Sequence, residues 1–184
     1  MKKFIASSAL VALLSVPSVV SADWDPEKER KEMQAVDDTV KAFKADHPNM
    51  PIYFDKAWGY VVFPTIGKAA FVFGGSHGKG KAFEQGKLVG NASLSKASIG
   101  LQAGAESYSM IVFFENKATM ATFKSNKFGF DAGASVTAVD KGAQAQAVWN
   151  KGVAVFTHNK GGLMAAASIG GQKFEFKPIE TAKK

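Results

Sequence analysis

Residues 98–114 read Ser-Ile-Gly-Leu-Gln-Ala-Gly-Ala-Glu-Ser-Tyr-Ser-Met-Ile-Val-Phe-Phe, and this stretch indicates the fold class. Its odd-numbered positions over 99–105 are apolar, whereas the even-numbered positions are glycine or polar. A period of two is that of a β-strand with one buried face. Glycine weakens a strand and is usually kept where a neighbouring group comes close. We therefore predict a strand over 99–105, crowded on its even-numbered face at Gly100 and Gly104, and a second strand over 107–114.

The region before this stretch begins with a helix signal. Asp25 followed by Pro26 is typical of a capped helix start, because proline is tolerated at the first helical position. Apolar residues then recur at helical spacing until His47-Pro48 ends the pattern. They are Met33, Val36, Val40 and Phe43. We predict a helix over 26–46 whose narrow apolar stripe packs on its own domain rather than on a membrane, with His47 in solvent at the helix end.

The remainder of the chain carries mostly strand patterns. Segments that are rich in β-branched and aromatic residues, or that alternate in polarity, are 59–63, 69–74, 79–83, 87–93, 128–139, 143–149, 153–158, 163–169 and 173–177. A short helix is expected over 116–124, and a short helix or turn over 51–57. The sequence therefore predicts an α+β fold. We expect a largely antiparallel, curled β-sheet, sandwich or barrel-like, with an N-terminal helix and one or two short helices packed on it.

The N-terminal residues have the pattern of a secretory signal peptide. Two lysines precede an apolar run over 4–16, and the small residues Val20-Ser-Ala22 follow. We expect cleavage between Ala22 and Asp23 and a periplasmic or secreted protein. A membrane anchor is the alternative, but the run is short for a bilayer. The absence of cysteine excludes both a lipoprotein anchor and disulfides. The expected boundaries are 1–22 for the signal peptide, 23–49 for the N-terminal helix, 50–178 for the β-rich domain and 179–184 for a frayed tail.

Charge favours an anionic partner. The formal net charge is +7, and removal of the two leader lysines lowers it to +5. Six lysines fall between residues 56 and 96 against one acid, Glu84. They are Lys56, Lys68, Lys79, Lys81, Lys87 and Lys96. Because no nucleic-acid-binding module is recognisable, lipid head groups fit this charge better than nucleic acid does. A solvated surface with scattered lysines is the simpler alternative.

Few residues suggest catalysis. There is no cysteine, the three histidines share no metal-ligand spacing, and no Gly-x-Ser-x-Gly motif occurs. We therefore predict no catalytic residue, no metal and no cofactor. Glu106, Asp131 and Asp140 remain candidates for a carboxylate pair only if the fold brings two of them together.

The glycine-rich segment 74–81 resembles a phosphate-binding loop only superficially. It lacks the spacing of a P-loop and lies between two strand patterns, whereas a P-loop leads from a strand into a helix. Two interpretations stay open. Its backbone amides could form an anion-binding nest with Lys79 or Lys81 adding charge, or the segment could be a plain flexible hairpin.

Five segments together resemble the SYLF domain, also called the Ysc84 actin-binding domain. They are Trp58-Gly-Tyr-Val-Val-Phe-Pro64, Gly74-Gly-Ser-His-Gly-Lys-Gly80, the stretch 98–114, Lys127-Phe-Gly-Phe-Asp-Ala-Gly-Ala134 and Asn159-Lys-Gly-Gly-Leu-Met-Ala-Ala-Ala-Ser168. They follow one another in family order, and the resemblance covers roughly residues 50 to 176. It implies a lipid-binding module, whose eukaryotic members are associated with phosphoinositides and actin.

The resemblance and the charge together lead to a functional expectation. We expect a non-enzymatic domain that associates peripherally with anionic phospholipid through a basic, glycine-rich surface. The head-group residues are expected to be Lys68, His77, Lys79, Lys81 and Lys87, and the structural motif to be Gly74, Gly75, Gly100, Gln102 and Gly104. An envelope scaffold with a protein partner is the first alternative, and an unrecognised hydrolase is the second.

Overall fold

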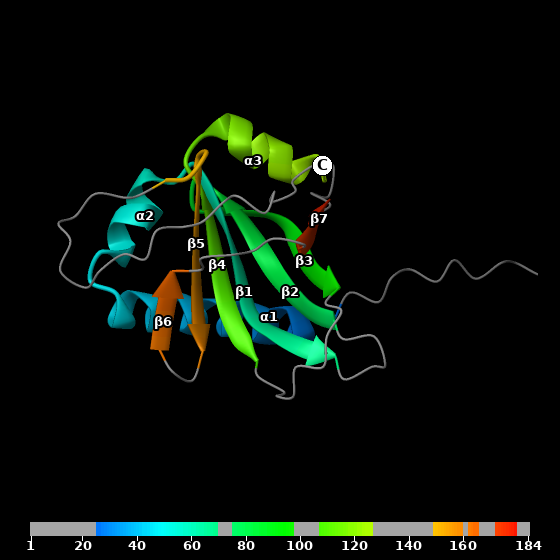
Figure 1. The fold of residues 1–184 in the computed structure, drawn as a ribbon. Helices are drawn as coiled ribbons and strands as arrows, with labels where there is room; N and C mark the ends of the chain where they lie inside the picture. Colours follow the sequence, from blue (N-terminus) through cyan, green and yellow to red (C-terminus); the bar gives the residue numbers. More distant parts are fainter. Residues whose placement is uncertain are drawn as a thin grey trace, which may run out of the picture.

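The structure is a computed structural model, and it describes residues 25–69, 75–97, 107–126, 149–159, 162–165 and 172–179. Over these ranges the helices are α1 (Pro26–Asp46), α2 (Met50–Lys56) and α3 (Lys117–Lys124). The strands are β1 (Gly59–Ala69), β2 (Gly75–Glu84), β3 (Lys87–Ala97), β4 (Tyr108–Phe114), β5 (Val153–Asn159), β6 (Gly162–Ala165) and β7 (Gln172–Pro178). These strands form one antiparallel sheet in the order β6-β5-β4-β1-β2-β3-β7 (Figure 1). The α+β prediction with a curled antiparallel sheet is confirmed, and the described sheet is not closed.

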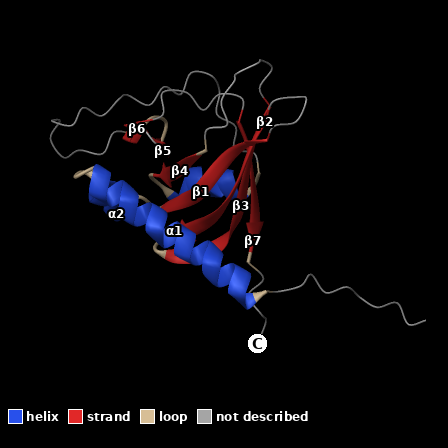
Figure 2. Ribbon diagram, turned by 90° about the horizontal axis from the view of Figure 1, so that it is seen from below, coloured by secondary structure: helices blue, strands red, loops and turns tan. Residues whose placement is uncertain are grey.

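Helix α1 begins where the sequence predicts. Asp25 caps it, because its Oδ1 accepts hydrogen bonds from the backbone N–H groups of Glu27 at 3.0 Å and Lys28 at 3.2 Å. The helix crosses the strands along one face of the sheet (Figure 2). Val36 is only 2 % exposed, and Phe43 is fully buried. The prediction that this helix packs on its own domain is therefore confirmed.

The central strands are apolar on both faces, because both faces are covered. On the α1 side, Val62, Ile111, Phe113 and Phe156 pack with Phe43 of α1 and with Met50 and Tyr53 of α2. On the opposite side, Phe63, Val112, Phe114 and Phe174 pack with Met120 and Phe123 of α3. Strand β4 accordingly has five consecutive buried residues, Met110–Phe114. Such a continuous apolar run is typical of a strand buried on both faces.

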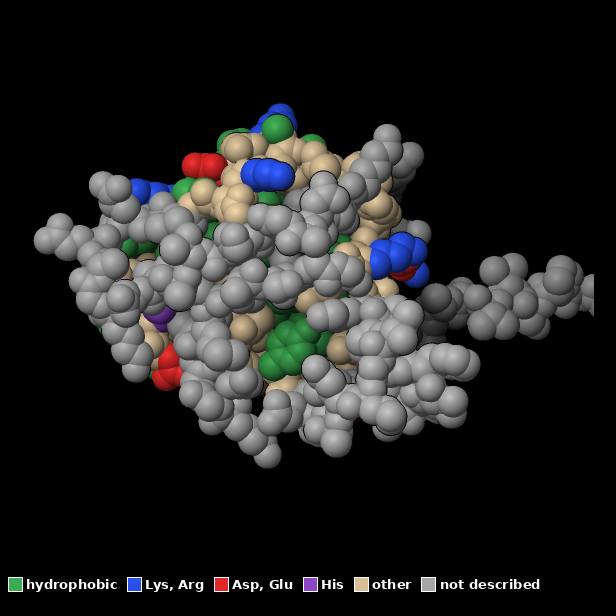
Figure 3. All heavy atoms as spheres, in the orientation of Figure 1, with side chains coloured by type: hydrophobic (Ala, Val, Ile, Leu, Met, Phe, Trp, Pro, Cys, Tyr) green, Lys and Arg blue, Asp and Glu red, His purple; other side chains and the backbone are tan. Residues whose placement is uncertain are grey.

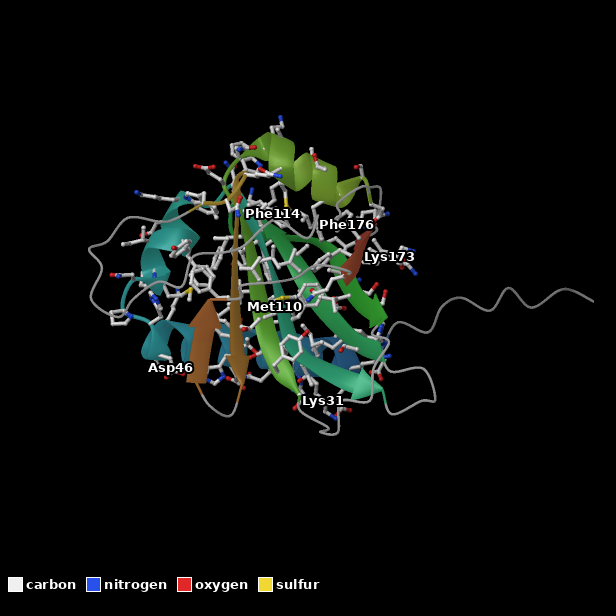
Figure 4. All side chains as sticks on the ribbon, viewed as in Figure 1. Lys31, Asp46, Met110, Phe114, Lys173 and Phe176 are labelled. Atoms are coloured by element: carbon white, nitrogen blue, oxygen red, sulfur yellow. The ribbon has the colours of Figure 1, made fainter. Side chains whose placement is uncertain are left out.

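Figures 3 and 4 show the face of the sheet that lies opposite α1. In Figure 3 the described charged side chains lie toward the rim, and hydrophobic side chains are visible at the centre. Figure 4 shows Met110 and Phe114 of β4 and Phe176 of β7 over the sheet. Lys31 of α1 and Lys173 of β7 lie at the periphery. The apolar cluster therefore occupies the middle of this face.

Strands β1 and β2 are longer than the sequence predicts. Strand β1 continues through Pro64, where its register with both neighbours shifts. Proline cannot donate to a ladder, and a bulge accommodates it. Gly75–Gly80 of the glycine-rich segment is not a flexible connection, because it is regular strand that pairs antiparallel with β1 and with β3. The predicted strands over 99–105 and 128–139 lie outside the described residues, as do Glu106, Asp131 and Asp140.

The predicted position of His47 is also wrong. Its side chain is not in solvent: the residue is 8 % exposed, and its ring lies edge-on to Phe156 at 5.8 Å between centroids. The reason is the turn into α2, in which the Met50 N–H bonds to the His47 carbonyl and folds the helix end onto the sheet. Nearby, His158 Nε2 lies 2.7 Å from Asp46 Oδ2 and ties the end of α1 to β5.

Candidate functional site

A groove of about 1050 Å³ lies between the first half of α1 and the strands β1, β2, β3 and β7. Helix α1 contributes side chains between Asp25 and Val36, and strands β1, β2, β3 and β7 contribute the floor. The volume is at the upper end of that of small-molecule sites. The groove is therefore large enough for a polar head group together with part of its attached chain.

The floor of the groove consists of polar side chains in rows across three strands. Strand register places Lys81, Asn91 and Lys177 opposite one another on β2, β3 and β7. The next row is Lys79, Ser93 and Glu175. Directly opposed residues of antiparallel strands present their side chains to the same face, about 5 Å apart. The sheet thus gathers residues separated by almost 100 positions into one polar surface.

Lys81 is the centre of this surface. The residue is 5 % exposed, and its ammonium donates to Asn91 Oδ1 at 2.7 Å. It also forms an ion pair with Glu32 Oε2 of α1 at 2.8 Å. A buried ammonium is costly unless it is paired and hydrogen-bonded, and these two oxygens satisfy it. The Glu32 side chain is 38 % exposed, so it reaches the lysine from the groove rather than from the core.

Most acids of the groove already have internal partners. Asp25 caps α1, Glu32 pairs with Lys81, and Glu175 pairs with Lys173 at 2.8 Å. The hydrogen bond from Lys173 and its charge lower the pKa of the Glu175 carboxyl, with a smaller contribution from Lys177. Among the described residues, by contrast, Lys28 and Lys79 form no ion pair, although both line the groove. The groove therefore presents uncommitted ammonium groups.

The structure brings together three of the predicted head-group residues and separates a fourth. His77, Lys79 and Lys81 follow one another at alternate positions of β2 and all line the groove. Lys87 lies on β3 opposite Glu84. It is four residues from Asn91 along that strand, so the two residues are about 13 Å apart. It does not line the groove.

Of the other predicted residues, two lie in described strands and the rest lie outside the described part of the chain. The backbone of Lys68 lies in β1 opposite Ser76. Gly75 begins β2, and the remaining motif residues lie outside the described part of the chain. They are Gly74, Gly100, Gln102 and Gly104. The anion-nest interpretation is wrong for Gly75–Gly80, because these residues belong to regular ladders with both neighbouring strands.

Sequence reasoning missed the contribution of α1 and β7. Glu32 and Lys28 lie on a helix that shares no pattern with the glycine-rich segment, and Lys177 lies almost 100 residues further on. The alternation of Phe174 and Phe176 with charged residues did indicate that one face of β7 is exposed to solvent. Only the register shows that this face adjoins Lys81.

In the described part of the chain, no group of three or more histidine, cysteine or acidic side chains could hold a metal ion. Nor does any helix within those ranges combine the length and the apolar character that crossing a bilayer requires.

Comparison with known proteins gives the family. The Ysc84 family, described as "Las17-binding protein actin regulator", matches residues 95–183. Just under half of the chain is therefore similar to the Ysc84 (SYLF) family. The match runs from the end of β3 through β7 and so includes Glu175 and Lys177. Lys79, Lys81 and Asn91 precede it.

The chain is also similar to a curated bacterial protein, Beta cell expansion factor A of Aeromonas veronii. The two are 28 % identical over 131 residues, which is 70 % of this chain and 49 % of that protein. The chain thus spans about half the length of the curated relative that it matches. The Ysc84 family is known for lipid and actin binding and is not a known enzyme family.

Proposed function

We propose that this chain is a non-enzymatic, peripheral lipid-binding domain whose groove beneath α1 receives the head group of an anionic phospholipid. The observation that carries this proposal is the pairing pattern of the groove, in which the acids Glu32 and Glu175 are neutralised by internal lysines while Lys28 and Lys79 form no ion pair among the described residues. Apolar groups of Ala35, Pro64 and Ile179 line the same groove. An amphipathic ligand matches this combination of exposed ammonium and apolar surface.

The family supports this proposal without specifying the ligand. Lipid binding is a property associated with the Ysc84 family, whereas its description names Las17 binding and actin regulation. A protein partner is therefore the alternative. For a protein exported from a bacterial cell, phosphatidylglycerol or cardiolipin is a more accessible anionic surface than phosphoinositide or actin.

Export is part of the proposal. It rests on the charged, apolar and small-residue sections of residues 1–22. Intact-mass measurement of the protein recovered from the cell envelope tests it. We expect a chain that begins at Asp23, and a chain that still begins at Met1 would contradict export.

The groove is tested by two matched lysine variants. Lys79→Gln removes one exposed charge from the groove, and Lys87→Gln removes one exposed charge from the same pair of strands outside it. A basic side chain close to an anionic membrane contributes on the order of 1 kcal/mol. We therefore expect Lys79→Gln to weaken binding to vesicles of phosphatidylglycerol and phosphatidylcholine about fivefold, and Lys87→Gln to weaken it less than twofold. Equal losses in the two variants would remove the groove from the binding site.

A further inference from the structure

The contact between Glu32 and Lys81 has the arrangement of an occupied anion site. An almost fully buried ammonium lies at the floor of the groove, and a carboxylate from a different element reaches it through the groove. The Asn91 side-chain oxygen accepts from Lys81, which leaves the amide N–H groups of Asn91 beside the same ammonium. Lys177 lies opposite Asn91 on the next strand. These donors suit a larger anion than one carboxylate.

We propose that Lys81 and Asn91 form the phosphate subsite of the groove, and that the Glu32 carboxylate occupies this subsite until a lipid phosphate displaces it. The inference rests on the proposed lipid-binding function and adds the residues that hold the phosphate and the group that competes with it. A phosphodiester oxygen accepts charge-assisted hydrogen bonds as a carboxylate oxygen does, and it brings a second oxygen for Asn91 or Lys177.

Displacement requires only a rotation of the Glu32 side chain. Val36 and Phe43 hold α1 on the sheet through buried apolar contacts, so the helix can stay in place when the ion pair opens. The displaced carboxylate is already 38 % exposed and can be solvated in the groove. Glu32 therefore lowers the affinity for the ligand, because the charge-assisted bond must break before phosphate binds.

Two variants of Glu32 and one control variant elsewhere on α1 separate the effect of this contact on binding from the effect of net charge. Glu32→Gln removes the competing charge, and Glu32→Asp keeps that charge on a side chain that is one methylene shorter. Glu27→Gln removes the same charge from an exposed position on α1, where Glu27 pairs only with Lys31 among the described residues.

Vesicles of phosphatidylglycerol and phosphatidylcholine, at one fixed salt concentration, are the probe. We expect Glu32→Gln to bind roughly tenfold more tightly than the wild type, which corresponds to one charge-assisted hydrogen bond. Glu32→Asp should gain at least threefold, and Glu27→Gln should gain less than twofold.

The dependence on Lys81 is the decisive part of the test. In Lys81→Met the Glu32→Gln gain should vanish, because no buried ammonium remains to be freed. A gain that persists in Lys81→Met, or an equal gain in Glu27→Gln, would overturn the subsite and indicate a general effect of charge. Thermal melts followed by circular dichroism identify variants that fail to fold, and Glu32→Asp, which keeps the carboxylate, carries the test if Glu32→Gln is among them.

The remaining outcomes separate this inference from the proposed function. If the wild type binds these vesicles and neither Glu32 variant binds more tightly, the subsite is wrong while lipid binding stands. If neither the wild type nor any Glu32 variant binds anionic vesicles, the proposed function fails. Stabilisation of Glu32→Gln by inorganic phosphate, without vesicle binding, would overturn the lipid as the source of the phosphate.

Discussion

At the scale of single residues, Gly78 and Gly80 of β2 are required because neighbouring atoms leave no space for a Cβ atom, and not because the chain must be flexible there. A Cβ atom on Gly80 would lie 2.7 Å from Phe63 Cδ1 and still closer to the Val62 carbonyl oxygen. One on Gly78 would lie 2.6 Å from Ile66 Cγ1. The side chains of β1 therefore fill the space above β2, and glycine is the residue that permits it. Close approach explains why a strand with poor intrinsic propensity lies in the interior of this sheet, between β1 and β3.

Gly80→Ala should destabilise the protein. The new methyl group meets a backbone carbonyl and a buried ring, and overpacking of this kind costs about 1–3 kcal/mol. Gly67→Ala on β1 is the matched control, because nothing lies within 4 Å of its added Cβ. Urea denaturation of both variants measures the difference. A Gly80→Ala protein as stable as Gly67→Ala would contradict the close packing of β1 on β2.

Glu84 is a second residue whose surroundings predict a measurable effect. It accepts hydrogen bonds from Trp58 Nε1 at 2.8 Å and from Lys124 Nζ of α3 at 2.6 Å. The bond from Lys124 first, and then that from Trp58, hold the pKa of this carboxyl below its ordinary value of 4.5. A carboxyl with a lowered folded-state pKa contributes stability above about pH 4.5, and the contribution is lost as the pH falls through the folded-state pKa.

Glu84→Gln should therefore cost about 1–2 kcal/mol at neutral pH, in the range of hydrogen bonds to charged groups. The difference between variant and wild type should shrink in acid, because the wild-type carboxyl is then protonated as well. Thermal melts at pH 7 and below pH 4 measure both quantities. A constant difference at all pH values would show that the ionised carboxylate is not what holds α3.

At the scale of elements, the helices could be predicted and the lengths of several strands could not. Asp25 and Asn116 are local capping signals, and both helices begin directly after them. Strands β1 and β2 depend instead on distant partners. The bulge at Pro64 and the packing of Phe63 over Gly80 are tertiary contacts, and no local pattern encodes them. Local propensity therefore predicted β1 only as far as residue 63 and β2 only from residue 79.

The junction of α1 and α2 should respond to acid through His47. Both of its ring nitrogens are buried without a hydrogen-bond partner among the described residues, and burial lowers the pKa of this histidine below its ordinary value of 6.5. A lowered histidine pKa means that the unfolded chain takes up the proton first. Stability is then complete above about pH 6.5 and falls as the pH drops from there toward the folded-state pKa.

His47→Leu should remove this part of the acid sensitivity. The variant fills the same apolar site without a titrating group, so we expect its stability between pH 7 and pH 5 to change less than that of the wild type. The Asp46–His158 contact is unchanged in the variant, which makes the comparison specific to His47. Identical pH dependence in the two proteins would mean that His47 does not titrate on unfolding in this range.

At the scale of the whole molecule, the groove could be predicted only in part. The basic character of β2 was visible in the sequence, and two of its lysines, Lys79 and Lys81, do line the groove together with His77. Helix α1 and strand β7 reach the same place through the crossing of the helix and the register of the sheet, neither of which a single sequence specifies. The same geometry explains why Lys81, predicted as one of several head-group residues on a basic surface, is a buried cation paired with Glu32.

The central claim is that the folded domain is attracted to anionic phospholipid, and vesicle flotation of the wild-type protein tests it most directly. The comparison is between phosphatidylcholine vesicles and vesicles that also contain phosphatidylglycerol, each at low and at physiological salt. Because the Debye length shortens to about 8 Å at physiological ionic strength, attraction by exposed lysines must weaken with salt. We predict flotation with the anionic vesicles alone, reduced at physiological salt. Equal flotation with neutral vesicles, or none with either kind, would contradict the claim.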